Sequence, residues 1–217
     1  MKPGAGTEPG GGERPMSFKA TDRIKIRIAG SGGQGVVLAS IILAEAAGIY
    51  SGFEVAQSQS YGPEARGGHC KAEIVVSDAP IENPRPLNLD VMETLNQASL
   101  DEYYYDLKDD GVLIVNSDLC LNVLKATAYK IPFSTLSRDK VGVRQTMNII
   151  ALGAFAGVTE IVTPASLKKA VLDRAPAGTE KANTKALDIG VREGRKAAEN
   201  MKHRLPRKFS RLILMNE

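Results

Sequence analysis

The sequence predicts an α/β fold, a single doubly wound and mainly parallel sheet with flanking helices. Three observations lead to this fold class. Residues 24–29 alternate apolar and charged side chains, as a strand with one covered face does. A glycine turn follows at residues 30–35, and from Val36 the chain is apolar nearly all round, which favours a helix lying deep against a sheet. Strands and helices then alternate along the rest of the chain.

The later elements follow from periodicity, turn residues and caps. Residues 53–59 and 70–77 alternate as strands do, and this hairpin-like pair interrupts the simple repeat. Thr163 and Pro164 form a helix start, with threonine as N-cap and proline at the first helical position. The other expected elements are strands at 89–93, 111–116 and 126–131 and helices at 97–108, 144–158 and 179–203, the last with Thr179 as its cap.

Composition indicates one domain with tails. The chain has 217 residues, is 43% hydrophobic, and carries 28 Lys and Arg against 25 Asp and Glu, a net charge of +3. That charge is too mild to indicate a nucleic-acid partner, so an anion site has to be local. We expect a disordered, glycine- and proline-rich leader at 1–22, a domain at 23–203, and a basic and apolar tail at 204–217 that is either solvated or docked on a partner.

Neither a secretory signal nor a membrane span is expected. The leader has no continuous apolar stretch, and no window approaches the roughly 20 apolar residues that a span requires. The simplest location is therefore the cytoplasm, with no membrane partner.

The glycine turn matches a phosphate-binding motif. Gly30, Ser31, Gly32, Gly33, Gln34 and Gly35 fit G-x-G-x-x-G between a strand and a helix, as its mechanism demands. Glycines let the backbone approach a phosphate, and the unpaired N–H groups at the helix start attract its charge. The alternative is a turn that only allows close strand–helix packing.

A dinucleotide site would also need an acidic residue at the carboxyl end of the second strand. Glu54 lies at the right distance along the sequence, but at the beginning of that strand. This placement disfavours NAD.

A second loop, residues 60–68, begins at the carboxyl end of the second strand, the edge where the first glycine turn lies. Two such loops could form opposite walls of one crevice. The candidate binding residues of this loop are Ser60, Tyr61, Glu64 and Arg66. Arg66 could clamp a phosphate or carboxylate, or only pair with Glu64; Tyr61 could stack on a ring or fill the core.

Motifs of other reaction classes are missing. His69 and His203 have no nucleophile in a recognisable motif, and Cys70 points to the strand face opposite His69. No GK[ST] follows the glycines. Cys70 and Cys120, without a CxxC motif, exclude a cysteine-ligated iron–sulfur cluster or structural zinc within this chain. We therefore assign no catalytic residue and no metal site to the chain itself.

Four segments together carry a family resemblance. They are Gly30–Val36 with the apolar helix after it, Gln59–Gly68, Ala72–Asp78 and Asn148–Gly153. With them the chain resembles the gamma subunit of the 2-oxoacid:ferredoxin oxidoreductases, a Rossmann-like domain, over roughly residues 24–200. The second loop looks most like that of the 2-oxoglutarate enzymes, with the branched-chain enzymes close behind. His69 and Cys70 depart from the small residues expected there.

The resemblance implies a function within a complex. In that family a 2-oxoacid is decarboxylated on thiamine diphosphate with Mg, electrons pass through iron–sulfur clusters to ferredoxin, and the acyl group goes to coenzyme A. This chain has no cluster cysteines and no Gly-Asp-Gly thiamine motif, so those steps belong to alpha and beta subunits, with a ferredoxin-like delta subunit in some complexes. The part left to this chain is to help bind CoA. The resemblance adds Asn148 as a candidate near the nucleotide, the alternative being a packing role.

Three hypotheses follow. The first is the gamma subunit of a CoA-acylating 2-oxoglutarate:ferredoxin oxidoreductase, or of its branched-chain counterpart, inactive when isolated. The second is a free-standing NAD(P)-dependent dehydrogenase. The third is a purely structural subunit whose glycine turn is filled by a partner's backbone.

Overall fold

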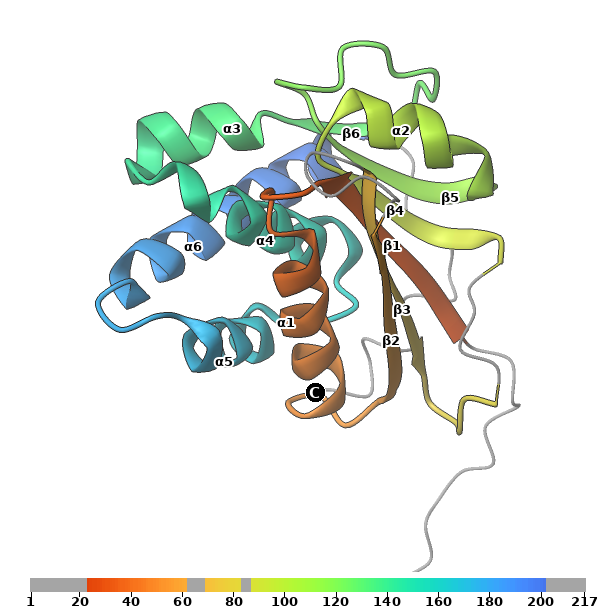
Figure 1. The fold of residues 1–217 in the computed structure, drawn as a ribbon, viewed down its shortest axis with the longest axis horizontal. Coiled ribbons are helices and arrows are strands. Elements are labelled where there is room, and N and C mark those ends of the chain that lie inside the picture. The colour runs from red at the N-terminus through yellow and green to blue at the C-terminus, as the bar shows by residue number, and fades with distance from the viewer. Residues whose placement is uncertain (1–22, 62–68, 83–86, 202–217) are drawn as a thin grey trace, which may run out of the picture.

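The computed structural model describes residues 23–61, 69–82 and 87–201, and the predicted leader and tail lie outside these ranges. Six strands form one mixed sheet in the order β2-β3-β1-β4-β5-β6 (Figure 1). The strands are β1 (Arg23–Ser31), β2 (Glu54–Tyr61), β3 (His69–Ser77), β4 (Leu89–Thr94), β5 (Leu107–Asn116) and β6 (Tyr129–Ile131).

One strand runs against the other five. β1, β4, β5 and β6 are paired in parallel, whereas β3 is antiparallel to both β1 and β2. The predicted hairpin is therefore β2 with β3, inserted at one side of an otherwise parallel sheet. The mainly parallel α/β fold is confirmed.

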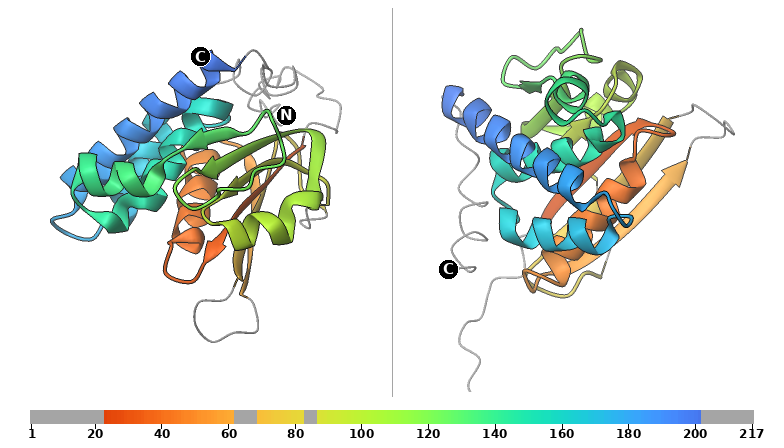
Figure 2. Two further views of the ribbon diagram at one scale, coloured as in Figure 1. Left: turned by 90° about the horizontal axis from the view of Figure 1, so that it is seen from above. Right: turned by 90° about the vertical axis from the view of Figure 1, so that its left-hand side faces the viewer.

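Helices cover both faces unequally (Figures 1 and 2). One face carries α1 (Val36–Gly48), α4 (Met147–Thr159), α5 (Pro164–Arg174) and α6 (Glu180–Asn200), which enclose the larger core cluster. The other face carries α2 (Gln97–Tyr103), whose Leu100 packs on Met92 and Leu113 in a smaller cluster. Burial on both faces explains the unbroken apolar run of β5, residues 112–115.

Several boundaries differ from those expected. The helix predicted at 97–108 ends at Tyr103, and a 3₁₀ turn at Tyr104–Asp106 leads into β5. The turn carries Asp106 to the guanidinium of Arg27, a side chain only 4% exposed that also donates to Glu73 at 2.9 Å. A buried cation requires such partners, so this tertiary contact overrides helix propensity.

The other differences from the expected elements are smaller. β6 begins at Tyr129 rather than 126, and α3 (Phe133–Leu136), with the π-helical turn Ser137–Val141 after it, was not predicted because four residues are too few to show a helical period. Thr163 caps α5 as expected, accepting from the backbone N–H of Ser166 at 3.0 Å. Thr179 stands before α6, but its hydroxyl donates to the Pro176 carbonyl and caps no backbone N–H.

Within the described ranges, every helix is too short or too polar to cross a bilayer.

Candidate functional site

The glycine turn joins β1 to α1 at the carboxyl edge of the parallel strands (Figure 1). The backbone N–H of Gln34 donates to the Ser31 carbonyl at 3.1 Å, and α1 begins directly after Gly35. Gly33 and Gly35 have φ of 88° and 75°, a region that glycine enters without steric cost. The motif thus has the strand–turn–helix geometry that its spacing predicts.

The side chain of Gln34 turns back over the loop. Its Oε1 accepts from the backbone N–H of Ser31 at 2.7 Å and from Nδ2 of Asn96 at 2.9 Å. A Cβ on Gly30 would lie 2.6 Å from the same oxygen, so only glycine leaves room for this contact. Gln34 and the Ser31 N–H shape the loop, and Gly32 and Gly33 are its exposed part.

The N-terminus of α1 is left open to a ligand. No side chain caps it, and its first turn holds no acidic residue. The first N–H groups of a helix lack intrahelical acceptors, and the helix dipole adds partial positive charge there. This end of α1 is therefore suited to an anion approaching over the exposed glycines.

Asn148, the second residue of α4, packs directly against the turn. It is 4% exposed, and its Nδ2 donates to the Gly35 carbonyl at 3.3 Å. A Cβ on Gly35 would lie 2.5 Å from that nitrogen, so Gly35 is needed for close approach as well as for its positive φ. The packing role left open by the sequence is present, and Asn148 also lines the neighbouring pocket.

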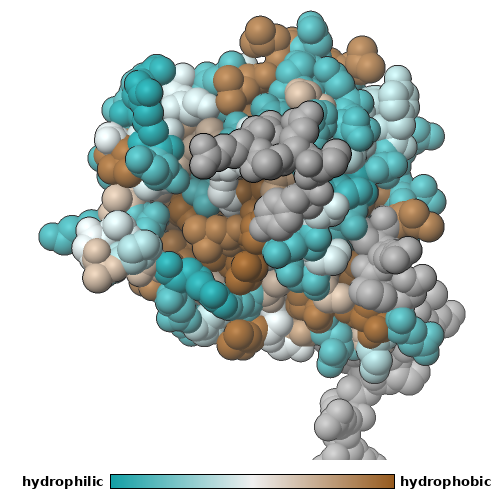
Figure 3. Space-filling model, viewed as in Figure 1, coloured by the Kyte–Doolittle hydropathy of each residue, from teal (hydrophilic) through white to brown (hydrophobic). Residues whose placement is uncertain are grey.

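A pocket of about 410 Å³ opens beside the turn, within the size range of small-molecule sites. Gly33, Gln34 and Gly35 of the turn line it, and Arg174 is among its other lining residues. Figure 3 shows a hydrophobic hollow on this face of the molecule. Its apolar walls include Leu38, Ile42, Val143, Ile149 and Val171, and its polar groups include Gln145, Asn148 and Asn183. An uncapped helix start next to apolar walls suits a ligand with a phosphate group and an apolar arm.

The second glycine-rich loop starts on the same edge. Tyr61, at the end of β2, pairs with Cys70, and Cys70 pairs with Gly30 across the sheet. Ser60 is exposed, whereas Glu64 and Arg66 lie outside the described residues. The contribution of all four candidate residues of this loop to binding stays a prediction.

Glu54 lies at the opposite edge of the sheet. It is the first residue of β2 and pairs with Ser77, the last residue of β3. Seven strand steps separate it from Tyr61, roughly 23 Å at the usual rise. Its carboxylate is therefore far from any ribose bound at the glycine turn.

The sequence did not single out Asn96 and Gln97. Asn96 caps α2 by accepting from the backbone N–H of Ser99 at 2.8 Å while its Nδ2 holds Gln34. Ser99 in turn donates its hydroxyl to the Gly30 carbonyl at 2.8 Å. An asparagine directly before a helix is an N-cap signal, but the link to Gln34 has no local signature.

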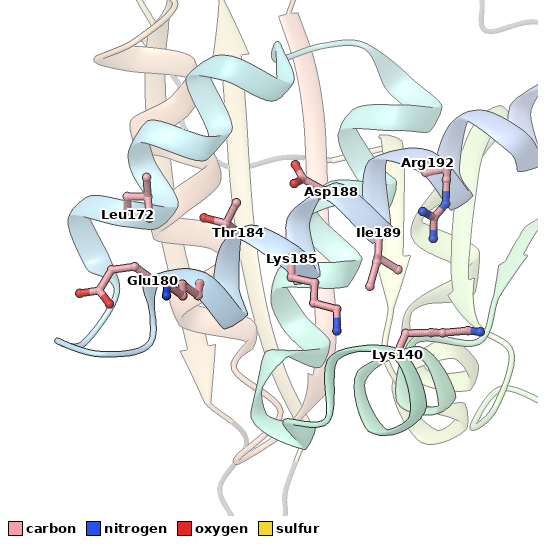
Figure 4. A pocket seen from close by; sticks show the side chains of 9 residues that line it. Lys140, Leu172, Glu180, Thr184, Lys185, Asp188, Ile189 and Arg192 are labelled. Carbon is pink, nitrogen blue, oxygen red and sulfur yellow. The ribbon is translucent and has the colours of Figure 1, made fainter.

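A larger groove, about 720 Å³, runs along α6 away from both loops (Figure 4). Lys185 and Arg192 of α6, Lys140 of the π-helical turn and Leu172 of α5 are among its lining residues. None of its lining residues belongs to the glycine turn or to the described part of the second loop. We therefore place the candidate site in the smaller pocket.

Both cysteines are buried free thiols. Burial raises the pKa of the Cys70 thiol, and burial likewise outweighs the hydrogen bond from Thr94 in raising the pKa of Cys120. Neither is activated as a thiolate nucleophile. In the part of the chain that the structure describes, no three His, Cys, Asp or Glu side chains gather as a metal site.

Residues 25–193 match the pyruvate ferredoxin/flavodoxin oxidoreductase family. The chain belongs to this family. The match takes in the glycine turn, the second loop and Asn148. The family resemblance drawn from the sequence is confirmed.

Individual relatives agree with it. The 2-oxoglutarate synthase subunit KorC of Methanocaldococcus jannaschii is 42% identical over 172 residues, covering 77% of this chain and 92% of the relative. The ketoisovalerate oxidoreductase subunit VorA of Methanothermobacter thermautotrophicus is 32% identical over 140 residues, 64% of this chain but only 29% of VorA. The crystal structure of a keto/oxoacid ferredoxin oxidoreductase gamma subunit from Geobacter sulfurreducens PCA matches with a TM-score of 0.75 and 39% identity, covering 81% of this chain and 98% of that one.

Proposed function

We propose that this chain is the gamma subunit of a 2-oxoglutarate:ferredoxin oxidoreductase and that its glycine turn holds the diphosphate of CoA. The complex converts 2-oxoglutarate, CoA and oxidised ferredoxin to succinyl-CoA, CO₂ and reduced ferredoxin. The observation that carries the proposal is the uncapped, acid-free start of α1 beside an apolar pocket of about 410 Å³. The diphosphate of CoA fits the uncapped start of α1, and its pantetheine arm fits the apolar pocket.

The remaining chemistry falls to partner subunits. With two cysteines and no Gly-Asp-Gly motif, this chain cannot itself hold the iron–sulfur clusters or thiamine diphosphate with its Mg. We assign those groups to alpha and beta subunits, joined in some complexes by a ferredoxin-like delta subunit. The flexible arm of CoA then has to reach from the glycine turn into a neighbouring chain. The cytoplasm is the location that suits this assembly.

The choice of 2-oxoacid rests on similarity. Identity to KorC is 42% over 172 residues, against 32% over 140 residues for VorA, which favours 2-oxoglutarate over a branched-chain substrate. A free-standing NAD(P)-dependent dehydrogenase is disfavoured, because Glu54 lies at the wrong edge of the sheet to hold a ribose.

A charge placed in the glycine turn tests the proposal. Gly32 is exposed and is not among the glycines with positive φ, so it accepts a side chain without backbone strain. In the assembled complex, Gly32→Asp should raise the KM for CoA by about tenfold or more, because a carboxylate within about 4 Å of a phosphate costs about 1 to 4 kcal/mol. The KM for 2-oxoglutarate should not change.

Gly32→Asn is the matched control, with the same size and no charge, and it should shift the KM for CoA much less. Both variants should assemble with the partner subunits and keep the parent melting temperature. Equal KM values for CoA in the two variants and the parent would exclude the diphosphate from this turn. Tight NADH binding that Glu54→Ala abolishes would instead support the dehydrogenase. Weakened assembly, with an unchanged KM for CoA in the fraction that still assembles, would support a structural role.

A further inference from the structure

The connection between β5 and β6 presents leucines to solvent. We call residues 117–128 the leucine loop. Its Leu119, Leu121 and Leu124 are 43%, 80% and 76% exposed. Figure 1 places this loop at the top of the molecule, and Figure 3 shows hydrophobic residues standing out at the top in the same view. A cluster of large apolar side chains on one surface segment is typical of an interaction site.

The leucine loop is held in place by side-chain hydrogen bonds. The side-chain amide of Gln97 makes two hydrogen bonds to the backbone of Asn122. Its oxygen accepts from the Asn122 N–H at 2.9 Å, and its nitrogen donates to the Asn122 carbonyl at 3.0 Å. Asp118 accepts from the backbone N–H and the hydroxyl of Thr135 at 2.7 and 2.9 Å. Cys120 is 3% exposed and anchors the loop in the smaller core cluster. A surface fixed in this way loses little conformational entropy when a partner covers it.

The leucine loop shares an edge of the sheet with the glycine turn, and two adjacent residues connect them. Asn96 donates a hydrogen bond to Gln34 of the glycine turn, and Gln97 accepts one from the backbone of Asn122 in the leucine loop. A partner bound to the leucine loop is thereby placed at a fixed distance from whatever the glycine turn binds.

We propose that the leucine loop docks into an apolar depression on the partner subunit that carries the 2-oxoacid chemistry. This rests on the proposed function, in which the thiol of CoA must reach that subunit from the edge that the loop shares. We prefer a different partner subunit over a second copy of this chain because one relative, VorA, is much longer than the segment that matches this chain. In VorA the matched segment is only 29% of the chain, so there the equivalent domain is covalently joined to a larger body.

The test is a double variant, Leu121→Asp with Leu124→Asp, in the chain co-expressed with its partner subunits. Two carboxylates in place of leucines that the partner would cover should weaken assembly by about 100-fold or more, measured as a dissociation constant by titration and sedimentation. Because both side chains are exposed, the melting temperature of the variant chain should match that of the parent.

The matched control is Leu87→Asp with Ile49→Asp. These side chains are 75% and 71% exposed and lie at the opposite edge of the sheet, before β4 and after α1. The control should assemble as the parent does. Unchanged assembly of the leucine-loop variant would overturn the proposal, and so would a parent chain that self-associates through this loop while the complex stays intact.

The outcome is separable from that of the proposed function. If the glycine turn does not bind CoA, Gly32→Asp fails to shift the KM while the leucine-loop variant still fails to assemble. If the docking proposal is wrong, the leucine-loop variant assembles while Gly32→Asp still raises the KM. At protein concentrations high enough to force assembly, the leucine-loop variant should show the parent KM for CoA.

Discussion

Glu93→Gln should make the isolated chain more stable at neutral and alkaline pH, by about 3 kcal/mol at pH 7 and more above pH 8. Glu93 is fully buried on β4 between its strand neighbours Ile28 and Ile114. Among the described residues, neither oxygen of its carboxyl group has a hydrogen-bond partner. Burial raises its pKa from 4.5 to about 8.

The direction of this pH dependence follows from when Glu93 loses its proton in the unfolded and in the folded chain. The unfolded chain loses this proton near pH 4.5, whereas the folded chain keeps it until about pH 8. The contribution of protonated Glu93 to stability is therefore fully present below pH 4.5, falls as the pH rises, and is lost above about pH 8. A glutamine has the same size and never ionises, so the advantage of the variant should grow over this range.

Urea or thermal unfolding of both chains at pH 5, 7 and 8.5, followed by circular dichroism, measures the difference. At pH 7 the variant should melt roughly 6–12 °C above the parent. Glu199→Gln, at an exposed position near the end of α6, is the control and should show no pH-dependent difference. A Glu93→Gln advantage that stays constant from pH 5 to 8.5 would contradict a raised pKa.

Gly190→Ala should destabilise the chain by about 3 kcal/mol or more, although alanine is the better helix former by about 1 kcal/mol. A Cβ at Gly190 would lie 2.1 Å from the Ile150 carbonyl oxygen and 2.9 Å from the Cα of Gly153. Both obstacles are backbone, so α4 and α6 would have to separate. Four glycines make this contact between the two helices, Gly153, Gly157, Gly190 and Gly194.

Gly48→Ala is the matched control. Gly48 is the last residue of α1, and a Cβ there would meet its nearest atom, on Val55, at 3.5 Å, an ordinary contact. This variant should keep or slightly raise the melting temperature, whereas Gly190→Ala should lower it by roughly 6–12 °C or give insoluble protein. Similar melting temperatures for the two variants would show that the helices are not packed backbone to backbone.

Much of the fold could be predicted because many of its helices and strands depend on residues that are close together in the sequence. The alternation in β1–β3, the apolar run of α1 and the Thr163 cap of α5 each depend on neighbours in sequence. The largest error in the predicted boundaries came from a contact with a residue distant in sequence. The helix predicted to reach residue 108 ends at Tyr103, because the turn that follows places Asp106 against the buried Arg27.

The candidate site divides in the same way. The glycine turn, its place between strand and helix, and the position of Glu54 could be read from residue order. The side-chain network around the turn could not, since Gln34 meets Asn96 across 62 positions and Asn148 meets Gly35 across 113. The same holds for the walls that α5 and α6 add to the pocket.

The sequence by itself determined the α/β fold, the glycine turn between strand and helix and the family resemblance, because periodicity, glycine spacing and motifs are properties of the chain alone. Only the tertiary structure decided that Gln34 is turned inward, that Glu93 is buried without a partner, and that the leucine loop stands beside the glycine turn. These depend on which side chains meet across the sheet, and no local pattern encodes that.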